Sequence, residues 1–184
     1  MAAIDPATVV FLDETSTHTS LGRTHGRSAR GTRLVGAVPR NHGPNVSCLA
    51  AVGVAGIVAP LAIEGAVDGA VFVPWLRDWL LPQLAPGTTI VCDNLSVHRH
   101  ALVRPAIEAA GCRLAYLPPY SPDFNPIEMI FAKLKAHLRA AAGRTFTALV
   151  DALGTGLASV TTADIAGCYR HCGYRLTATA SQPL

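Results

Sequence analysis

Short apolar runs alternate along the chain with segments of helical periodicity. The first run, Val9 to Leu12, is partly β-branched, and it predicts a buried strand that ends at Asp13. A longer uncharged stretch, 46–63, is interrupted by glycines and a proline, so we interpret it as two strands joined by a tight turn. The predicted strands cover 9–12, 46–53, 57–64, 88–92 and 114–117.

Apolar residues recur at helical spacing between and after these strands. One such segment stops at Pro82, and an alanine-rich one is closed by Gly111. The strongest pattern begins at Pro126, a residue that suits the first helical position, and Asn125 before it is a good N-cap. The predicted helices cover 69–81, 100–110, 126–142 and 146–159, followed by a short element near 163–171.

This order of elements predicts an α/β fold with a mixed sheet flanked by helices. The chain has 184 residues and half of them are apolar, which is enough to bury one core, so we expect a single domain over residues 1–184. The glycines and the proline within 46–63 argue against a membrane-spanning helix. Residues after Leu176 are expected to fray.

The five cysteines indicate a reducing compartment. Their number is odd, and Met1 is not followed by a basic stretch leading into an apolar core, so we expect a cytoplasmic protein with no membrane segment. His171 lies between Cys168 and Cys172, but one such pair is weak evidence for a zinc site.

The charges of this chain are unevenly distributed, although the net charge is only +3. No acidic residue lies between Glu14 and Glu64, and the same interval is rich in arginine. These arginines are Arg23, Arg27, Arg30, Arg33 and Arg40. A basic loop can bind a polyanion or can simply be solvated. We favour nucleic acid, because a loop that only confers solubility more often mixes both signs of charge.

Three carboxylates stand where predicted elements end or begin. Asp13 and Asp93 each follow an apolar strand, and Glu128 lies in the first turn of a helix. Carboxylates gathered in this way hold divalent metals for phosphodiester chemistry. Each has a structural alternative: an aspartate after a strand can start a turn, and Glu128 can form a capping box with Asn125.

The helix that carries Glu128 also carries two cations on the same face. Lys135 and Arg139 lie within about 20° of Glu128 around a helix of 3.6 residues per turn. An apolar stripe on the same helix can dock it on the sheet. This arrangement favours an interface with a phosphate backbone over a simple helix cap.

Several motifs resemble the DDE superfamily endonuclease domain of bacterial insertion-sequence transposases, in the insertion-sequence 630 group related to mariner-type elements. The matching segments are 11–14, 22–33, 92–98, 117–128, 133–135, 144–145 and 172–174. Between Asp93 and Glu128 lie 34 residues, the acidic spacing for which this group is known. The resemblance extends from about Val9 to Tyr174.

The resemblance implies a ribonuclease-H-like fold and a DNA transposase activity. Asp13, Asp93 and Glu128 would be the catalytic carboxylates and would hold two Mg²⁺ or Mn²⁺ ions. The enzyme would cut element ends and join their 3′-hydroxyls to target DNA at TA dinucleotides. The expected supporting residues around the ligands are Glu14, Asn94, His98 and Asn125. The expected DNA-binding residues are Arg23, Arg27, Arg30, Arg33, Lys135 and Arg139.

Members of this group also carry a helix-turn-helix region upstream that reads the element ends. Met1 lies only twelve residues before Asp13, so we expect this region to be absent, or supplied by another polypeptide, and the chain to act as a homo-oligomer on DNA. Two other hypotheses are a catalytically silent remnant that only binds DNA or a partner transposase, and an unrelated α/β phosphohydrolase. The acidic spacing and the arginine loop disfavour the latter.

Overall fold

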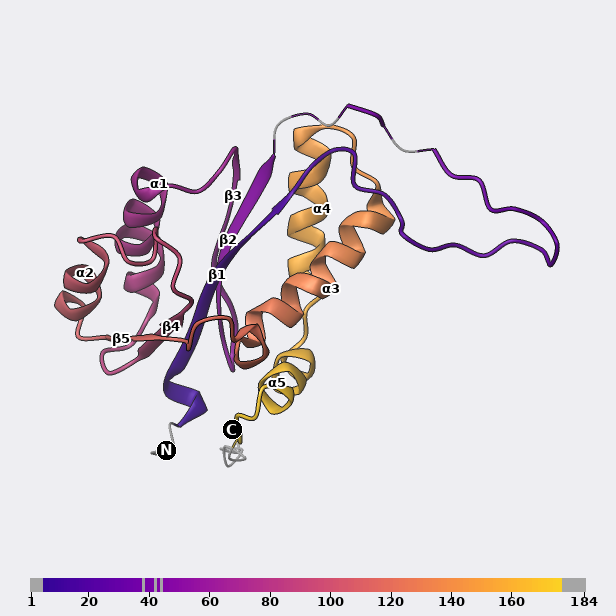
Figure 1. Cartoon of the computed structure of the whole chain (residues 1–184). Helices are drawn as coiled ribbons and strands as arrows, with labels where there is room; N and C mark the ends of the chain where they lie inside the picture. Colours follow the sequence, from indigo (N-terminus) through magenta and orange to yellow (C-terminus); the bar gives the residue numbers. More distant parts are fainter. Residues whose placement is uncertain (1–4, 38, 42, 44, 177–184) are drawn as a thin grey trace, which may run out of the picture.

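The computed structural model describes residues 5–37, 39–41, 43 and 45–176. Its centre is a five-stranded mixed sheet in the order β3-β2-β1-β4-β5 (Figure 1). The strands are β1 (Val9–Thr17), β2 (Val46–Gly53), β3 (Gly56–Glu64), β4 (Thr89–Cys92) and β5 (Arg113–Tyr116). The first three strands pair antiparallel, and β4 and β5 extend the sheet in parallel with β1.

Helices cover both faces of this sheet (Figure 1). One face carries α1 (Gly69–Pro74), the turns η2 (Trp75–Leu80) and η3 (Leu81–Gln83), and α2 (Val103–Ala109). The other carries α3 (Pro126–Ala141), α4 (Phe146–Ala158) and α5 (Thr162–His171). Two short turns, η1 (Pro6–Thr8) and η4 (Pro122–Phe124), precede β1 and α3. The mixed sheet flanked by helices is thus as predicted.

Alternation along β1 assigns its residues to two separate core layers. Val9 and Phe11 pack in the layer under α3, α4 and α5, whereas Val10 and Leu12 pack in the layer under α1 and α2. Every side chain from Val9 to Leu12 is buried, as the continuous apolar run predicted. The same alternation turns the next residue, Asp13, toward the α3 side of the sheet.

The prediction that the first strand ends at Asp13 is wrong. β1 continues to Thr17, and its polar second half pairs with β2 from Asp13↔Ala50 to Thr17↔Val46. A ladder uses backbone groups, so polar side chains do not end it, and the β-branched Thr15 and Thr17 are buried within it.

Two helices also differ from their predicted form. The segment 69–81 is not one α-helix, because α1 passes into a π-helical turn in which the Leu81 N–H donates to the Leu76 carbonyl. α2 begins at Val103 rather than near residue 100, which places Pro105 in the first turn, where no N–H is needed. The remaining bounds agree with the prediction within one or two residues. The segment after Leu176, expected to fray, lies outside the described residues.

The arginine-rich segment between β1 and β2 extends far from the sheet (Figure 1). Its described residues form no helix or strand, and the described side chains from residue 23 onward are exposed. The loop is fastened at its start by Arg144, whose Nη1 donates to the carbonyls of Thr19 and Leu21 at 2.7 and 2.9 Å. Since Arg144 lies between α3 and α4, these helices set where the loop leaves the body of the molecule.

The uncharged segment 46–63 forms β2 and most of β3, as predicted. Within the described part of the chain, no single helix is long and apolar enough to cross a membrane. α4 and α5 reach that length and composition only as a pair, and they are bent by 80°.

Candidate active site

Asp13 and Asp93 are brought together by the parallel pairing of β1 with β4. The last pair of that ladder is Phe11↔Val91, and each aspartate lies two residues beyond it. Both side chains line one pocket of about 360 Å³, and Glu128 from the first turn of α3 lines it too. The structure therefore gathers the three predicted carboxylates, although two of them are separated by more than a hundred residues in sequence.

Asp13 is only 5% exposed, and both of its carboxylate oxygens accept hydrogen bonds. The Glu14 N–H donates to Oδ1 and the Asn125 Nδ2 donates to Oδ2, each at 2.8 Å. Asn125 is the N-cap residue of α3, and Pro126 occupies the first helical position as predicted. The capping-box interpretation of Glu128 is wrong, because the Asn125 side chain makes no capping bond and contacts Asp13 instead.

The pKa of Asp13 is raised to about 7. Burial is the main cause, and the negative charges of Glu128, Asp93 and Glu14 add to it, while the Glu14 N–H opposes the shift. None of the described residues that line the pocket is a lysine or an arginine. The pocket lining thus brings carboxylates together with no lysine or arginine among them, which suits the binding of a divalent cation to oxygen ligands.

His98 is fully buried and bridges two carboxylates on different strands. Its Nδ1 lies 2.6 Å from Asp93 Oδ1, and its Nε2 lies 2.9 Å from Glu14 Oε2. The Phe72 ring packs against it at a centroid distance of 4.9 Å. Burial lowers the pKa of His98, but the bonds and charges of Glu14 and Asp93 outweigh burial and raise the pKa above its usual value of 6.5. A protonated ring donates from both nitrogens, as this geometry requires.

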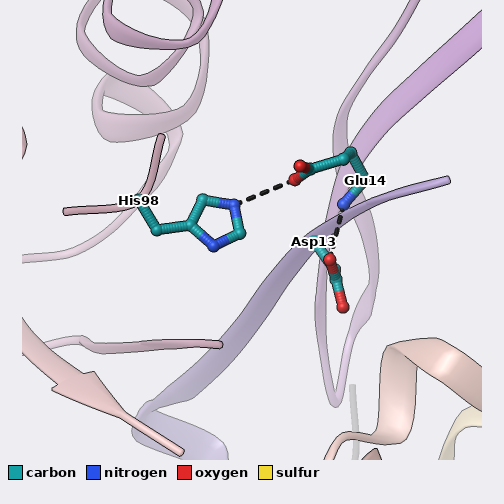
Figure 2. Close-up of side chains that lie close together, drawn as sticks. All are labelled: Asp13, Glu14 and His98. Atoms are coloured by element: carbon teal, nitrogen blue, oxygen red, sulfur yellow. Dashed lines mark hydrogen bonds and ion pairs between the residues drawn. The ribbon is translucent and has the colours of Figure 1, made fainter. Parts of the chain in front are cut away.

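A second group of possible metal ligands includes Asp13, Glu14 and His98, whose ligand atoms lie within 4.8 Å of one another. Figure 2 shows that the Glu14 carboxylate is bonded to the His98 ring, whereas the Asp13 carboxylate accepts from the Glu14 backbone N–H and has no bond to His98. Both His98 nitrogens are already engaged by carboxylates, so a cation there would displace a hydrogen bond and a proton. A cation between Asp13, Asp93 and Glu128 would leave both bonds of His98 in place, although near neutral pH it would displace a proton from Asp13, whose pKa is raised to about 7.

The other predicted site residues lie in three places: the pocket lining, the helix α3 and the arginine loop. Asn94 lines the pocket, but its Nδ2 donates to the Leu117 carbonyl at 2.6 Å and so holds the chain after β5. Lys135 and Arg139 are half-buried on α3. The loop arginines Arg23, Arg27, Arg30 and Arg33 are exposed, and none of them lines the pocket.

Two residues near this site were not singled out from the sequence. Tyr120 lies on the pocket rim with its side chain entirely exposed, and Arg144 fastens the arginine loop. The sequence could have indicated Tyr120, because it is an aromatic residue between Pro119 and Pro122. Prolines restrict the backbone there, so the ring can be held in place without being packed. Arg144 lies in the matching segment 144–145, but nothing in the local sequence indicates that it binds the start of the arginine loop.

A family model described as DDE superfamily endonuclease matches residues 8–150. Among curated proteins, none matches the sequence significantly. The solved structures similar to this chain include three complexes of the Mos1 transposase. The pre-cleavage transpososome has a TM-score of 0.72 at 15% identity, covering 92% of this chain and 54% of that chain.

The Mos1 strand transfer complex has a TM-score of 0.69 at 18% identity, covering 91% of this chain and 51% of that one. The mariner Mos1 paired end complex with Mg has a TM-score of 0.70 at 15% identity, covering 91% and 54%. At these identities the similarity establishes the fold, and the predicted ribonuclease-H-like fold is confirmed. This chain spans about half the length of the solved chains.

Proposed function

We propose that this chain, which belongs to the DDE superfamily endonucleases, is the catalytic domain of a DNA transposase. It cleaves the ends of its element and joins the freed 3′-hydroxyls to target DNA. The observation that carries this proposal is the pocket in which Asp13, Asp93 and Glu128 converge without a compensating lysine or arginine. The likeness to Mos1 complexes captured before cleavage and after strand transfer supports the same reaction class.

Asp13, Asp93 and Glu128 would hold Mg²⁺ or Mn²⁺, with two ions per site. Their oxygen atoms are the ligands that these hard cations prefer, and a pocket lined by carboxylates with no lysine or arginine fits them. Of the similar Mos1 paired end complexes, one is a complex with Mg and another is a complex with Mn. When bound, such ions lower the barrier to phosphodiester cleavage by activating an attacking oxygen and stabilising the leaving oxygen.

The chain's own residues orient the carboxylates. His98 holds Asp93 through Oδ1, and Asn125 holds Asp13 through Oδ2. The bond from Asn125 also ties the start of α3 to β1, so that Glu128 in the first helical turn lines the same pocket. A carboxylate fixed in this way loses less entropy when it binds a ligand.

DNA would follow α3 and the arginine loop. Lys135 and Arg139 lie along the helix that begins at the pocket, and the exposed arginines continue this basic surface from the far end of α3. Each such contact with a phosphate adds affinity that falls as salt rises. These residues would position the DNA backbone and would not themselves distinguish one base from another.

Sequence-specific reading of the element ends would come from a helix-turn-helix region, in the rest of a longer chain or in a separate polypeptide. Assembly on DNA would be as a homo-oligomer, with TA as the target dinucleotide.

The five cysteines are all free of disulfides, in keeping with the predicted cytoplasmic location.

We predict that Asp93→Asn abolishes Mn²⁺-dependent nicking of supercoiled DNA and leaves retention of the protein on a DNA column largely intact, because the basic surface is untouched. Equal nicking by wild type and variant would contradict the catalytic assignment. A titration of Mn²⁺ into wild type, Asp13→Ala and Glu128→Gln separates an enzyme from a silent remnant. The remnant is favoured if the wild type itself binds no metal.

A further inference from the structure

One rim of the carboxylate pocket is formed by the segment that joins β5 to α3. Within this segment, Tyr120 is wholly exposed and lines the pocket beside Pro119 and Pro122. No hydrogen bond or ring contact involves its side chain among the described residues. Leu95, which is 45% exposed, lines the same pocket. An aromatic ring and an aliphatic side chain thus face solvent next to the catalytic carboxylates.

The position of Tyr120 is fixed by its neighbours and not by its own packing. Asn94 binds the Leu117 carbonyl before it, and the Tyr174 hydroxyl donates to the Phe124 carbonyl after it, at 2.8 Å. Prolines at 118, 119 and 122 restrict the backbone further. The ring is therefore presented at a defined place on the rim.

The backbone of Tyr120 adopts a conformation that a bulky residue disfavours. Its φ is +55°, in the left-handed region that glycine adopts readily and a tyrosine adopts rarely. Such outliers gather at functional sites, where the surrounding structure holds them. Here neither burial nor a bond of the side chain compensates, so stability alone gives no reason for a tyrosine at this position.

The chemistry of the pocket rim indicates which kind of ligand would bind the Tyr120 ring. The carboxylates beside it repel a phosphate unless a cation is present, whereas the face of a nucleobase is uncharged and stacks on aromatic rings. A base inside a duplex has both faces covered by its neighbours. We propose that Tyr120, flanked by Leu95 and Pro119, forms a stacking site for one unstacked nucleobase adjacent to the phosphate on which the carboxylates act. This inference rests on the proposed function.

The test compares two duplexes of one sequence, one fully paired and one in which a single base lies opposite an abasic site. Binding is measured by fluorescence anisotropy in Ca²⁺, a cation that also takes oxygen ligands. We expect the wild type to bind the duplex with the unpaired base about tenfold more tightly, in keeping with the usual strength of one aromatic stack. Because every base has a stacking face, the preference should hold for all four bases.

Three substitutions of Tyr120 separate stacking from a structural role. Tyr120→Phe should keep the preference, and Tyr120→Ala and Tyr120→Gly should lose it. Tyr120→Gly should not lower the melting temperature, because glycine accepts the left-handed backbone. Trp79→Ala is the matched control, since Trp79 is also exposed, at 53%, but lies on η2 away from the pocket.

The outcomes distinguish this site from the reaction itself. If Tyr120→Ala retains the wild-type preference, or if the wild type has none, the stacking site is overturned. The proposed function still stands in that case, provided that the wild type nicks DNA with Mn²⁺ and Asp93→Asn does not. If the wild type fails to nick DNA, the proposed function and the stacking site fall together.

Discussion

His98 joins two carboxylates through one buried ring, and it is the residue whose role the geometry defines best. With Nδ1 on Asp93 and Nε2 on Glu14, the ring fixes one oxygen of Asp93 and leaves the other directed elsewhere. A charged ring between two carboxylates also offsets part of the charge that burial makes costly. His98 acts on the reaction only through Asp93.

We expect His98→Gln to reduce the kcat of nicking about 10- to 100-fold, the usual effect of removing a group that orients a ligand. The KM for DNA should change little, because His98 is buried and lies outside the basic surface. Steady-state nicking assays at several DNA concentrations check this split. A change in KM alone would contradict the positioning role.

Asp13 predicts an unusual pH dependence of stability in the metal-free protein. Its pKa rises from 3.8 in the unfolded chain to about 7 in the fold, so the folded state binds the proton more tightly. The free energy of unfolding therefore falls progressively as pH rises from about 4 to 7, because the buried Asp13 carboxyl loses its proton. Above pH 7 this decrease is complete. The shift corresponds to at most about 4 kcal/mol.

In the presence of a chelator, Asp13→Asn should raise the free energy of unfolding at pH 8 by roughly 2–4 kcal/mol and change it little at pH 4. Asparagine has a similar shape and no charge to bury. Urea unfolding of both proteins at the two pH values measures the difference. An equal effect at both pH values would show that the charge of Asp13 is not the cause.

The three carboxylates of the pocket, and Glu14, His98 and Asn125 beside them, could be named from the sequence and its family resemblance, but the individual bonds between them could not. The positions of Asp13, Asp93 and Glu128 follow from local patterns and from the spacing of a known family. The bond between Asn125 and Asp13 joins residues 112 positions apart, and no local pattern contains it. Glu128 taken alone therefore suited a helix cap as well as a catalytic role, and only the cations on its helix face and its spacing from Asp93 favoured the second.

At the scale of elements, α3 links the pocket to the arginine loop. Its first turn carries Glu128, its middle carries Lys135, and the turn after it carries Arg144. Ala142, in the left-handed conformation, ends the helix and directs Arg144 toward the start of the loop. A displacement of α3 would therefore alter the position of Glu128 in the pocket and the loop together.

Arg144→Ala should weaken DNA binding by roughly three- to tenfold, because the loop loses two bonds that direct it, each of them charge-assisted. Arg144→Lys is the informative control. Lysine retains the charge but lacks the planar guanidinium that reaches both carbonyls. In fluorescence anisotropy at fixed salt, the DNA affinity of Arg144→Lys should be close to that of Arg144→Ala. A wild-type DNA affinity in Arg144→Lys would show that only the charge of Arg144 matters.

Element boundaries were predictable where apolar patterns determine them, and not where backbone pairing does. α3, α4 and the two strands within 46–64 follow their hydrophobic spacing closely. β1 extends beyond its apolar half because the β2 ladder continues past Asp13. The π-helical turn at Trp75–Leu80 has no counterpart in the apolar stripe, which is the same for either kind of helix.

At the scale of the whole molecule, the described residues form a sheet with a core layer on each face, and a basic loop leaves the body of the protein (Figure 1). The carboxylate pocket lies where residues just beyond the β1–β4 pairing meet the start of α3. The sheet and its helices could be predicted from the order of elements. The gathering of Asp13, Asp93 and Glu128 was also predicted, but the size and lining of the pocket were not, because the segments around 13, 93, 117–122 and 125–128 meet only in the fold.

The most direct test of this account is to locate Mn²⁺ by anomalous scattering in a crystal soaked with the ion. We predict a peak in the pocket, in contact with Asp13, Asp93 and Glu128, and its loss in crystals of Asp93→Asn. A peak between Glu14 and His98, or no peak in the wild-type pocket, would contradict the central claim that the three carboxylates form the metal site of a DNA-cleaving enzyme.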